Sequence, residues 1–314
     1  MVIGLNAVIV TVTDEEPRVL TVRRARQSGE GYADALPSGP FIPEDHRTLE
    51  LGVRQWVGTQ TDLTLGYVEQ LYTFGDQGRD PREQEGGPRF LSVGYLALVR
   101  EAKLGGEEGG AWLDWYRYFP WEDWRHGRPA LIDEAILPAL KQWAQEPKRS
   151  GEQKERYRRV MASFGDSASG WNEELVLDRY ELLYEAGLVD EALRDRNIAA
   201  PVHFPSTPMA LDHRRILATA MGRLRGKIKY RPLVFELMPP VFTLLQLQKA
   251  VEALAGTRLH KQNFRRLVEK GGLVEGTGKK VLGTGGRPAE AFRFRQDVVA
   301  EHASLSGRLP ALRG

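Results

Sequence analysis

The pattern of apolar and polar positions predicts strands interrupted by one helix in the first 100 residues. Apolar, β-branched runs at 5–13 and 17–24 flank a short acidic turn, which predicts a β-hairpin. Apolar residues recur at helical spacing over 43–57, and residues 67–75 and 90–100 again have the composition of strands. Because strands and helices do not alternate regularly, we expect an α+β fold, a mixed-sheet sandwich.

Helical patterns dominate the middle of the chain. An amphipathic helix over 128–146 closes the first unit, and 172–193 has a helical period with a glycine near its middle. The stretch 199–208 carries three prolines and is the best candidate for a linker. Residues 147–200 are read as a small helical segment that packs on the first domain or bridges to the second. The expected organisation is a first domain over 1–146, a helical segment with linker over 147–207, and a second domain over 208–314.

The last third has the pattern of a winged helix-turn-helix. A helix is expected from 211 to 226, and the next begins with a capping box, Thr243 three residues before Gln246, and ends at Gly256. A further helix ends at the next glycine pair. The segment LVEGTGKKVLGTGGRPAEAFRF then predicts two short strands joined by a glycine- and lysine-rich loop. This order of helix, turn, helix and hairpin is typical of a winged helix-turn-helix domain.

Charge is distributed unevenly between the two ends of the chain. Residues 201–314 contain 20 Lys and Arg against 8 Asp and Glu, whereas residues 1–200 contain 24 against 34. A basic domain joined to an acidic one indicates that the last third meets a polyanion. The alternative is a surface that is merely basic.

The second helix of a helix-turn-helix enters the major groove and contacts bases with its early side chains. Amide side chains bind adenine edges in bidentate fashion, and arginine binds guanine. The polar face of the predicted helix offers Lys261, Gln262, Asn263, Arg265 and Arg266. The glycine-rich loop adds cations for phosphates: Lys279, Lys280 and Arg287. A solvated basic face is the alternative, but the charge asymmetry and the predicted wing favour double-stranded DNA.

Composition excludes several other classes of function. The chain has no cysteine, which excludes disulfides, thiolate metal sites and cysteine nucleophiles. The first residues lack a basic region and read as a strand, not a signal peptide. No apolar stretch approaches the ~20 residues of a membrane span. We therefore expect a cytoplasmic protein that does not enter a membrane.

Residues 37–63, PSGPFIPEDHRTLELGVRQWVGTQTDL, resemble the Nudix box of pyrophosphohydrolases, G-x5-E-x7-R-E-U-x-E-E-x-G-U, in which U is bulky and apolar. Gly39 and Arg54 are fifteen positions apart, one more than in the box. The Glu after the Arg is Gln55 here, and the Glu pair is Gly58-Thr59, or Thr59-Gln60 in a shifted register.

Catalytic Nudix boxes hold divalent cations with carboxylates on one helix face. Here Asp45 or His46 stands in the place of the first Glu, and Glu50 is one turn before Arg54 and is expected to pair with it. One carboxylate cannot assemble a two-cation site, so we expect neither a metal site nor catalytic residues, and no cofactor. The opposing possibility is that loop acids, Glu83 and Glu85, supply replacement ligands.

A ligand pocket can persist after the chemistry is lost. Paired arginines end the second strand, where charge-assisted bonds would hold a phosphate, and the loop TFGDQGRDPR adds an aromatic ring and further charges. The residues predicted to bind a ligand are Arg23, Arg24, Phe41, Phe74, Arg79, Asp80 and Arg82. The alternatives are that the arginines are only solvated and that Phe74 belongs to the core.

The chain resembles the Nudix-related transcriptional regulators of NAD metabolism, the NrtR family. The resemblance rests on the degenerate box from Gly39 to Leu63, on LYTFGDQGRDPR at 71–82, and on a carboxyl-terminal run that includes FTLLQLQKAVEALAG, LHKQNFRRLVEKGGLVEGT and GRPAEAFRF. It covers residues 5–100 and 211–296. It implies a Nudix-like sensor domain joined to a winged-helix DNA-binding domain. Such proteins mostly repress genes of NAD biosynthesis or salvage, with ADP-ribose as antirepressor, although some relatives sense other small molecules, including sugar-related ones.

The leading hypothesis is therefore a ligand-responsive repressor that binds a palindromic operator as a homodimer. The runner-up is a pyrophosphohydrolase for ADP-ribose or a similar nucleotide, whose basic domain serves only localisation or RNA contact. A third possibility, a general nucleic-acid-binding protein without a sensor, leaves the arginine-rich pocket without a purpose.

Overall fold

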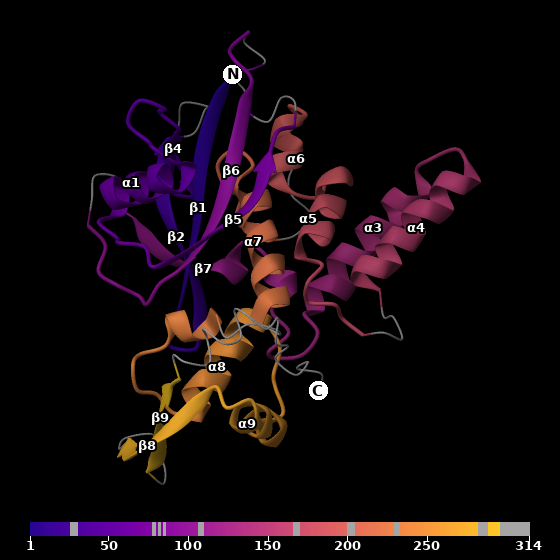
Figure 1. Cartoon of the computed structure of the whole chain (residues 1–314). Coiled ribbons are helices and arrows are strands. Elements are labelled where there is room, and N and C mark those ends of the chain that lie inside the picture. The colour runs from indigo at the N-terminus through magenta and orange to yellow at the C-terminus, as the bar shows by residue number, and fades with distance from the viewer. Residues whose placement is uncertain are drawn as a thin grey trace.

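The computed structural model describes residues 1–25, 31–76, 80, 83, 86–105, 110–165, 170–199, 205–228, 233–281 and 288–295. Figure 1 shows a twisted sheet flanked by helices, with a smaller part made of α8, α9 and the β8–β9 hairpin at one end of it. Within the described residues no helix is both long enough and apolar enough to cross a membrane.

A seven-stranded mixed sheet forms the first part. Its strands are β1 (Val2–Thr13), β2 (Glu16–Ala25), β3 (Tyr32–Ala35), β4 (Ser38–Pro40), β5 (Tyr67–Phe74), β6 (Phe90–Leu98) and β7 (Ala111–Asp114). The main order is β3-β2-β1-β6-β5, while β4 pairs with β1 and β7 pairs with β2. Only β1 and β6 run parallel among these pairs. The predicted α+β class with a mixed sheet is confirmed.

One helix lies between β4 and β5, and the other helices follow β7 in the chain. The helices are α1 (Leu49–Thr61), a π-turn (Ile132–Ile136) continuous with α3 (Leu137–Gln145), α4 (Ser150–Phe164), α5 (Val176–Glu185), α6 (Asp190–Asp195), α7 (His213–Ile228), α8 (Leu244–Ala255) and α9 (Lys261–Lys270). Short 3-10 turns lie at Trp115–Arg117, Pro120–Glu122 and Leu233–Leu237.

The predicted hairpin joins β1 to β2 through a two-residue turn. Thr13 pairs with Glu16, so only Asp14 and Glu15 lie between the strands, with φ of 52° and 64°. Two consecutive left-handed residues match the right-handed twist of the flanking strands. Glu16 therefore begins β2 and is not part of the turn.

The two faces of β1 pack against different helices. Leu5 and Ile9 belong to the apolar cluster that includes Val53 of α1. Val8 belongs to the larger cluster on the opposite face, which includes Ile216 of α7. Because side chains alternate along a strand, α1 and α7 cover opposite faces of the sheet, as Figure 1 shows.

The helix expected at 43–57 begins and ends later in the structure. Thr48 lies outside the helix, and its Oγ accepts a hydrogen bond from the Leu51 amide at 3.1 Å, which fixes the start of α1. The helix ends at Asp62, which has a left-handed φ of 60°. Its apolar face is as predicted, and only its boundaries were wrong.

A helical hairpin, α3 with α4, projects away from the sheet in Figure 1. Pro138 in the first turn of α3 follows the π-turn, where the regular backbone hydrogen bonding is already interrupted. The Arg156 guanidinium lies 4.1 Å from the Trp143 ring centre and donates to the Trp143 carbonyl at 2.9 Å. These contacts hold the two helices together. The predicted helical character of 147–200 is confirmed for the described residues.

The winged helix follows the predicted order. Thr243 and Gln246 form the expected capping box of α8, and Gly256 ends that helix with φ 71°. After α9 come β8 (Val274–Val281) and β9 (Ala289–Phe294). Phe242 adds a bridge to Phe292 of β9, with reciprocal backbone hydrogen bonds of 3.0 and 2.8 Å.

The helix α7 runs along the sheet toward the winged helix. It packs on β1, β5 and β6 over most of its length, and it also contacts α5 and α8. One apolar cluster extends from Val8 through Met221 of α7 to Leu247 of α8 and Phe264 of α9. The domain boundaries given above therefore stay predictions, since α7 is shared between the two packing units.

A buried ion-pair cluster joins α7 to three other elements. The Glu122 carboxylate accepts hydrogen bonds from Arg179 of α5, at 2.6 and 2.8 Å, and from Arg225 of α7, at 2.7 Å. None of the three residues is more than 1% exposed. Arg225 also donates to the Leu254 carbonyl near the end of α8 at 3.1 Å. The end of α7 is thereby tied to both the sheet domain and the winged helix.

The same ion-pair cluster explains why position 256 is a glycine. A Cβ at Gly256 would lie 2.5 Å from the Glu122 carbonyl oxygen and 2.7 Å from the Arg225 guanidinium, and the residue has a positive φ. The Gly256 carbonyl accepts a hydrogen bond from the Trp124 amide at 2.7 Å. The turn between α8 and α9 is therefore seated directly on the sheet domain.

Candidate ligand-binding cleft and nucleic-acid interface

A cleft of about 250 Å³ lies where β1, β4 and β6 meet the start of α7. It is lined by Val2, Gly4, Leu5, Asn6, Arg24, Ser38, Gly39, Pro40, Asp80, Phe90, Ser92, Leu211, Asp212 and His213. The lining comes from segments far apart in the sequence, including the strand β1 and the residues that begin α7.

Small residues keep the floor of the cleft open. In the sheet register Gly4 lies opposite Ser92 of β6, and Asn6 lies opposite Ser38 of β4. A Cβ at Gly4 would lie 3.4 Å from the Ser92 hydroxyl, and the floor has no large side chain at these four positions. Side chains opposite one another in a sheet share a face, so Asn6 stands among short neighbours.

The start of α7 forms one wall and is fixed to the sheet. His213 is 2% exposed, and its Nδ1 accepts a hydrogen bond from the Leu36 amide at 2.9 Å. Leu211, two residues before His213, has a positive φ of 49°, a strained conformation for a leucine. The chain thus makes a sharp turn at the cleft before α7 begins.

The residues of the degenerate box hold β4 in place. The Gln60 amide donates to the Ser38 carbonyl and accepts from the Ser38 amide, both at 3.0 Å. The Trp56 indole N–H donates to the Pro40 carbonyl at 2.8 Å, and a Cβ at Gly39 would collide with this ring at 2.2 Å. The box glycine is therefore required for the approach of α1 to β4, a wall of the cleft.

Glu50 and His46 of the box have structural partners. The Arg54 guanidinium donates to the Glu50 carboxylate at 2.8 Å, which confirms the predicted pairing, and it also donates to the Gly66 carbonyl. His46 is buried, and its Nδ1 accepts from the Ile42 amide at 3.0 Å. Across the ranges that the structure describes, no group of three or more His, Asp or Glu side chains is placed to hold a metal ion.

Of the two loop acids considered as replacement ligands, Glu83 has another role and Glu85 lies outside the described residues. The Glu83 carboxylate accepts a hydrogen bond from the Phe90 amide at 2.8 Å, which fixes the start of β6. The absence of a metal therefore stays a prediction for the whole chain.

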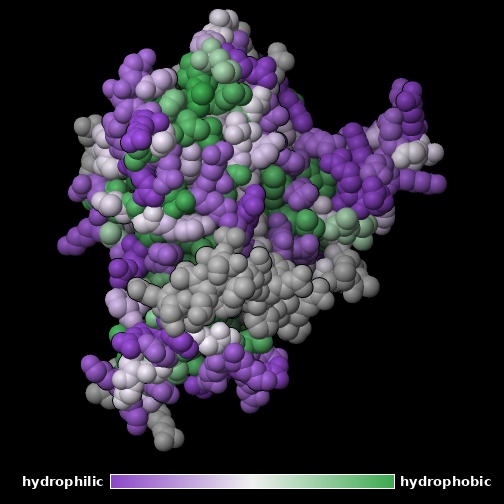
Figure 2. Space-filling model, in the orientation of Figure 1, coloured by the Kyte–Doolittle hydropathy of each residue, from purple (hydrophilic) through white to green (hydrophobic). Residues whose placement is uncertain are grey.

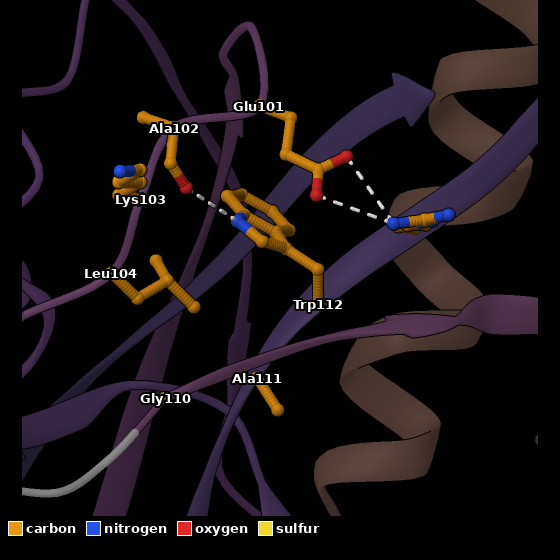
Figure 3. Close-up of a pocket in the computed structure, with 8 residues that line it drawn as sticks. Glu101, Ala102, Lys103, Leu104, Gly110, Ala111 and Trp112 are labelled. Atoms are coloured by element: carbon orange, nitrogen blue, oxygen red, sulfur yellow. Dashed lines mark hydrogen bonds and ion pairs between the residues drawn. The ribbon is translucent and has the colours of Figure 1, made fainter. Parts of the chain in front are cut away.

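A second hollow of about 520 Å³ lies on another part of the sheet domain, between β2, β7 and the segment after β6. Figure 3 shows the Trp112 indole beside the Glu101 carboxylate and pointing its N–H to the Ala102 carbonyl, at 3.1 Å. Glu101 pairs with Arg18 at 3.2 Å. None of the predicted ligand residues lines this hollow.

The exposed face of α9 is rich in hydrogen-bond donors. The side chains of Lys261, Gln262, Asn263, Arg265 and Arg266 are all exposed, and none bonds to another described residue. The opposite face is fixed by Phe264 and Val268, which are 4% and 7% exposed. Figure 2 shows mostly hydrophilic side chains over this end of the molecule.

The position of two lysines that were predicted to lie in the loop of the β8–β9 hairpin differs from the prediction. Lys279 and Lys280 are exposed, but they lie within β8 and not in the loop, because Lys280 pairs with Glu290 of β9 in the sheet register. A β-strand gives them fixed positions near the tip of the hairpin. The third predicted cation, Arg287, lies outside the described residues.

Comparisons with known proteins agree with this arrangement. Residues 234–294 match the family model described as the NrtR DNA-binding winged helix domain. An "ADPR responsive transcriptional repressor" of Acinetobacter baylyi is 42% identical over 86 residues, which are 27% of this chain and 34% of the relative. The match thus spans about a third of the length of that relative.

Solved structures resemble almost the whole chain. NrtR of Shewanella oneidensis superposes with a TM-score of 0.57 at 21% identity, covering 96% of this chain and 97% of the other. The same protein bound to a 27mer DNA gives 0.54 at 22% identity, with 95% of each chain covered. The family match is thus carried by the winged helix at 234–294, and almost the whole chain shares the fold of these NrtR structures. A MutT/nudix family protein of Enterococcus faecalis also shares the fold, with a TM-score of 0.54 at 15% identity over 94% of this chain and 86% of that one.

Six of the seven predicted ligand residues divide into three groups. Arg24 and Asp80 line the cleft. Arg23 and Phe41 do not line it, since Arg23 is the next residue along β2 and Phe41 packs 5.7 Å from His46 on the α1 side. A third group, Arg79 and Arg82, lies outside the described residues.

The prediction that Phe74 stacks on a base is wrong for this structure. Its side chain is 1% exposed in the core that contains α7, and the Arg215 guanidinium lies 5.8 Å from its ring centre. The aromatic ring is therefore part of the packing between β5 and α7.

Sequence reasoning missed most of the cleft lining. Asn6, Ser38, Ser92, Asp212 and His213 were not selected, although all five contribute polar groups. One signal was present: Asn6 is a single amide inside the apolar run LNAVIV, where an uninterrupted core strand needs none. The serines and the helix-starting residues gave no such signal.

Proposed function

We propose that this protein is a ligand-responsive transcriptional regulator, a repressor of NAD-metabolism genes, that binds operator DNA through its winged helix. ADP-ribose or a related nucleotide in the cleft of a catalytically degenerate Nudix-like domain would release it. The proposal extends to this chain what is printed of two relatives, an ADPR-responsive repressor and a DNA-bound NrtR. On this ground we place it in the cytoplasm, with the DNA.

The observation that carries the proposal is the course of α7. The helix begins at His213 in the wall of the cleft and ends near Arg225, which bonds to the end of α8. A ligand that displaces the start of α7 would act on a helix that reaches the DNA-binding part. Interiors are close-packed and transmit such displacements.

The cleft suits part of a nucleotide. Its volume lies below the ~300–1,000 Å³ of pockets that enclose a whole small molecule, so part of the ligand would remain outside. Arg24 is exposed at the cleft, and its guanidinium has no partner among the described side chains. A diphosphate at this position would form charge-assisted hydrogen bonds with it.

Hydrolysis is the second candidate, and the box geometry argues against it. The box arginine and its carboxylate are paired with each other, while Gln60 and Trp56 bond to the β4 backbone. The helix face that would hold cations is thus used to position β4. Incubation with ADP-ribose and magnesium or manganese should yield no AMP above background; release at ordinary enzymatic rates would support the pyrophosphohydrolase.

We also infer that the protein binds a palindromic operator as a homodimer, because two recognition helices must reach successive major grooves. Light scattering of the complex with the protein's own upstream DNA should give two chains per site. A mass of one chain per site would exclude this mode of binding.

Binding of the ligand and binding of operator DNA should weaken each other. Saturating ADP-ribose is expected to weaken operator affinity by ~5- to 150-fold, which corresponds to the usual coupling of ~1–3 kcal/mol. Linkage requires that operator DNA weaken ADP-ribose binding by the same factor. Mobility shifts with and without ligand measure the first factor, and calorimetry of the protein with and without operator measures the second.

The Arg24→Ala variant separates a specific effect from a nonspecific one. It should lose ligand affinity but keep operator affinity in the absence of ligand, because Arg24 is far along the chain from the winged helix and exposed on the sheet. An operator affinity that saturating ADP-ribose leaves unchanged, or no binding of ADP-ribose to the full chain, would contradict the proposal.

A further inference from the structure

The cleft contains one buried amide that the fold itself does not use. Asn6 is 3% exposed and lines the cleft floor. Its carboxamide has no hydrogen-bond partner among the described residues, and its atoms are not sealed in the core. These atoms therefore face the open space of the cleft, where a bound ligand can take the place of water as their hydrogen-bond partner.

Charge decides which part of a nucleotide reaches this amide. The only Lys or Arg side chain among the described lining residues is Arg24, which is exposed. A diphosphate forms its strongest hydrogen bonds with such a cation. The diphosphate therefore stays near Arg24, and an uncharged part of the ligand occupies the floor beside Asn6.

The amide also defines the chemistry of that uncharged part. An Asn carboxamide presents one acceptor and a donor side by side, which matches the N6 amino group and N7 of adenine. The short side chains of Ser38 and Ser92 leave space for a flat ring over the sheet. We propose that Asn6 is the specificity-determining residue of the cleft and selects an adenine base through its N6 and N7 atoms.

This inference rests on the proposed nucleotide sensing and adds its base specificity. In the bound state the Asn6 Oδ1 accepts a hydrogen bond from the adenine amino group, and Nδ2 donates to N7. Hypoxanthine carries an oxygen in place of the amino group, so either orientation of the amide leaves its oxygen facing another acceptor. A correct bidentate pair discriminates by ~5- to 150-fold.

The test titrates the full chain with ADP-ribose, with its hypoxanthine counterpart and with its 7-deazaadenine counterpart by calorimetry. The wild-type protein should bind ADP-ribose ~5- to 150-fold more tightly than the hypoxanthine analogue, and the 7-deaza analogue should also bind more weakly. Asn6→Leu removes the amide at similar size and should abolish the preference. Gln55→Leu, the same change at an exposed amide on α1, should keep it.

The outcomes separate the two proposals. Binding of ADP-ribose without preference over either analogue, or an unchanged preference in a folded Asn6→Leu variant, would overturn the role of Asn6 and leave nucleotide sensing intact. No binding of any of the three nucleotides would remove the sensor proposal itself, and with it this one. Because the comparisons with the two analogues use only the wild-type protein, the test does not depend on the folding of the Asn6→Leu variant.

Discussion

Replacing Glu122 with glutamine is expected to lower the free energy of unfolding by ~3–5 kcal/mol, the usual effect of removing one partner from a buried ion pair. Glu122 bonds to Arg179 and Arg225, and all three residues are buried. The substitution leaves two guanidinium groups in the core without a countercharge, and desolvated charges are costly. Urea unfolding followed by circular dichroism measures the change.

A matched control lies on the surface of the helical hairpin. Glu155 pairs with Arg158 at 2.6 Å, but both side chains are exposed. Glu155→Gln should therefore leave the free energy of unfolding almost unchanged. If Glu122→Gln were as stable as this control, the carboxylate would not be what neutralises the two buried guanidinium groups.

Replacing the whole cluster should give a different result. The triple variant Glu122→Leu, Arg179→Met and Arg225→Met removes the charges together, and such replacements are often neutral or stabilising. Operator binding of this variant would then report what the ion pairs contribute besides stability, because Arg225 is the residue that bonds to the end of α8. A stable triple variant with unchanged ligand–DNA coupling would mean that the signal does not pass through this contact.

The buried arginines also show where sequence reasoning overestimated a signal. The excess of basic residues in 201–314 includes Arg214 and Arg225, which are 0% and 1% exposed and pair with Glu191 and Glu122. A count of charges cannot distinguish a buried ion pair from a surface patch. The inference of a nucleic-acid face therefore depends on α9, whose polar side chains are exposed and unpaired among the described residues.

Helices and strands with a clear periodic pattern of apolar residues could be predicted from the sequence. The contacts between these elements could not. The β1–β2 hairpin and the capping box of α8 follow from local patterns, because turn and cap chemistry act within a few residues. The start of α1 was placed too early because the apolar spacing extends past its cap, Thr48. The cleft brings together Gly4, Ser92 and Leu211, and no local pattern reports such distant neighbours.

The role of the box helix illustrates the same limit. The sequence indicated that the cation-binding carboxylates were replaced, and Glu50 pairs with Arg54 as predicted. It did not indicate what the replacements do, since Gln60 and Ser38 are twenty-two positions apart and their reciprocal bonds depend on the packing of α1 on β4. The loss of a motif can be recognised in a sequence, whereas a new contact between distant residues can be recognised only in the structure.

The double variant Asn263→Ala, Arg265→Ala is expected to weaken specific operator binding by up to ~2–6 kcal/mol, because each of the two bidentate base contacts that it removes contributes ~1–3 kcal/mol. Both side chains are exposed on α9, while Phe264 between them is buried and fixes the orientation of the helix. Binding to random DNA should change much less, since it depends on phosphate contacts. Fluorescence anisotropy with the upstream DNA and a shuffled duplex measures both affinities.

Lys280→Ala is the matched control for base reading. The lysine is exposed on β8 of the wing, and a phosphate contact there carries no sequence information. This variant should weaken both duplexes about equally and reduce the slope of log K against log salt concentration by ~0.9, the loss of one phosphate contact. Equal losses for both duplexes in the α9 double variant as well would mean that α9 binds the backbone and that the bases are read by another part of the chain.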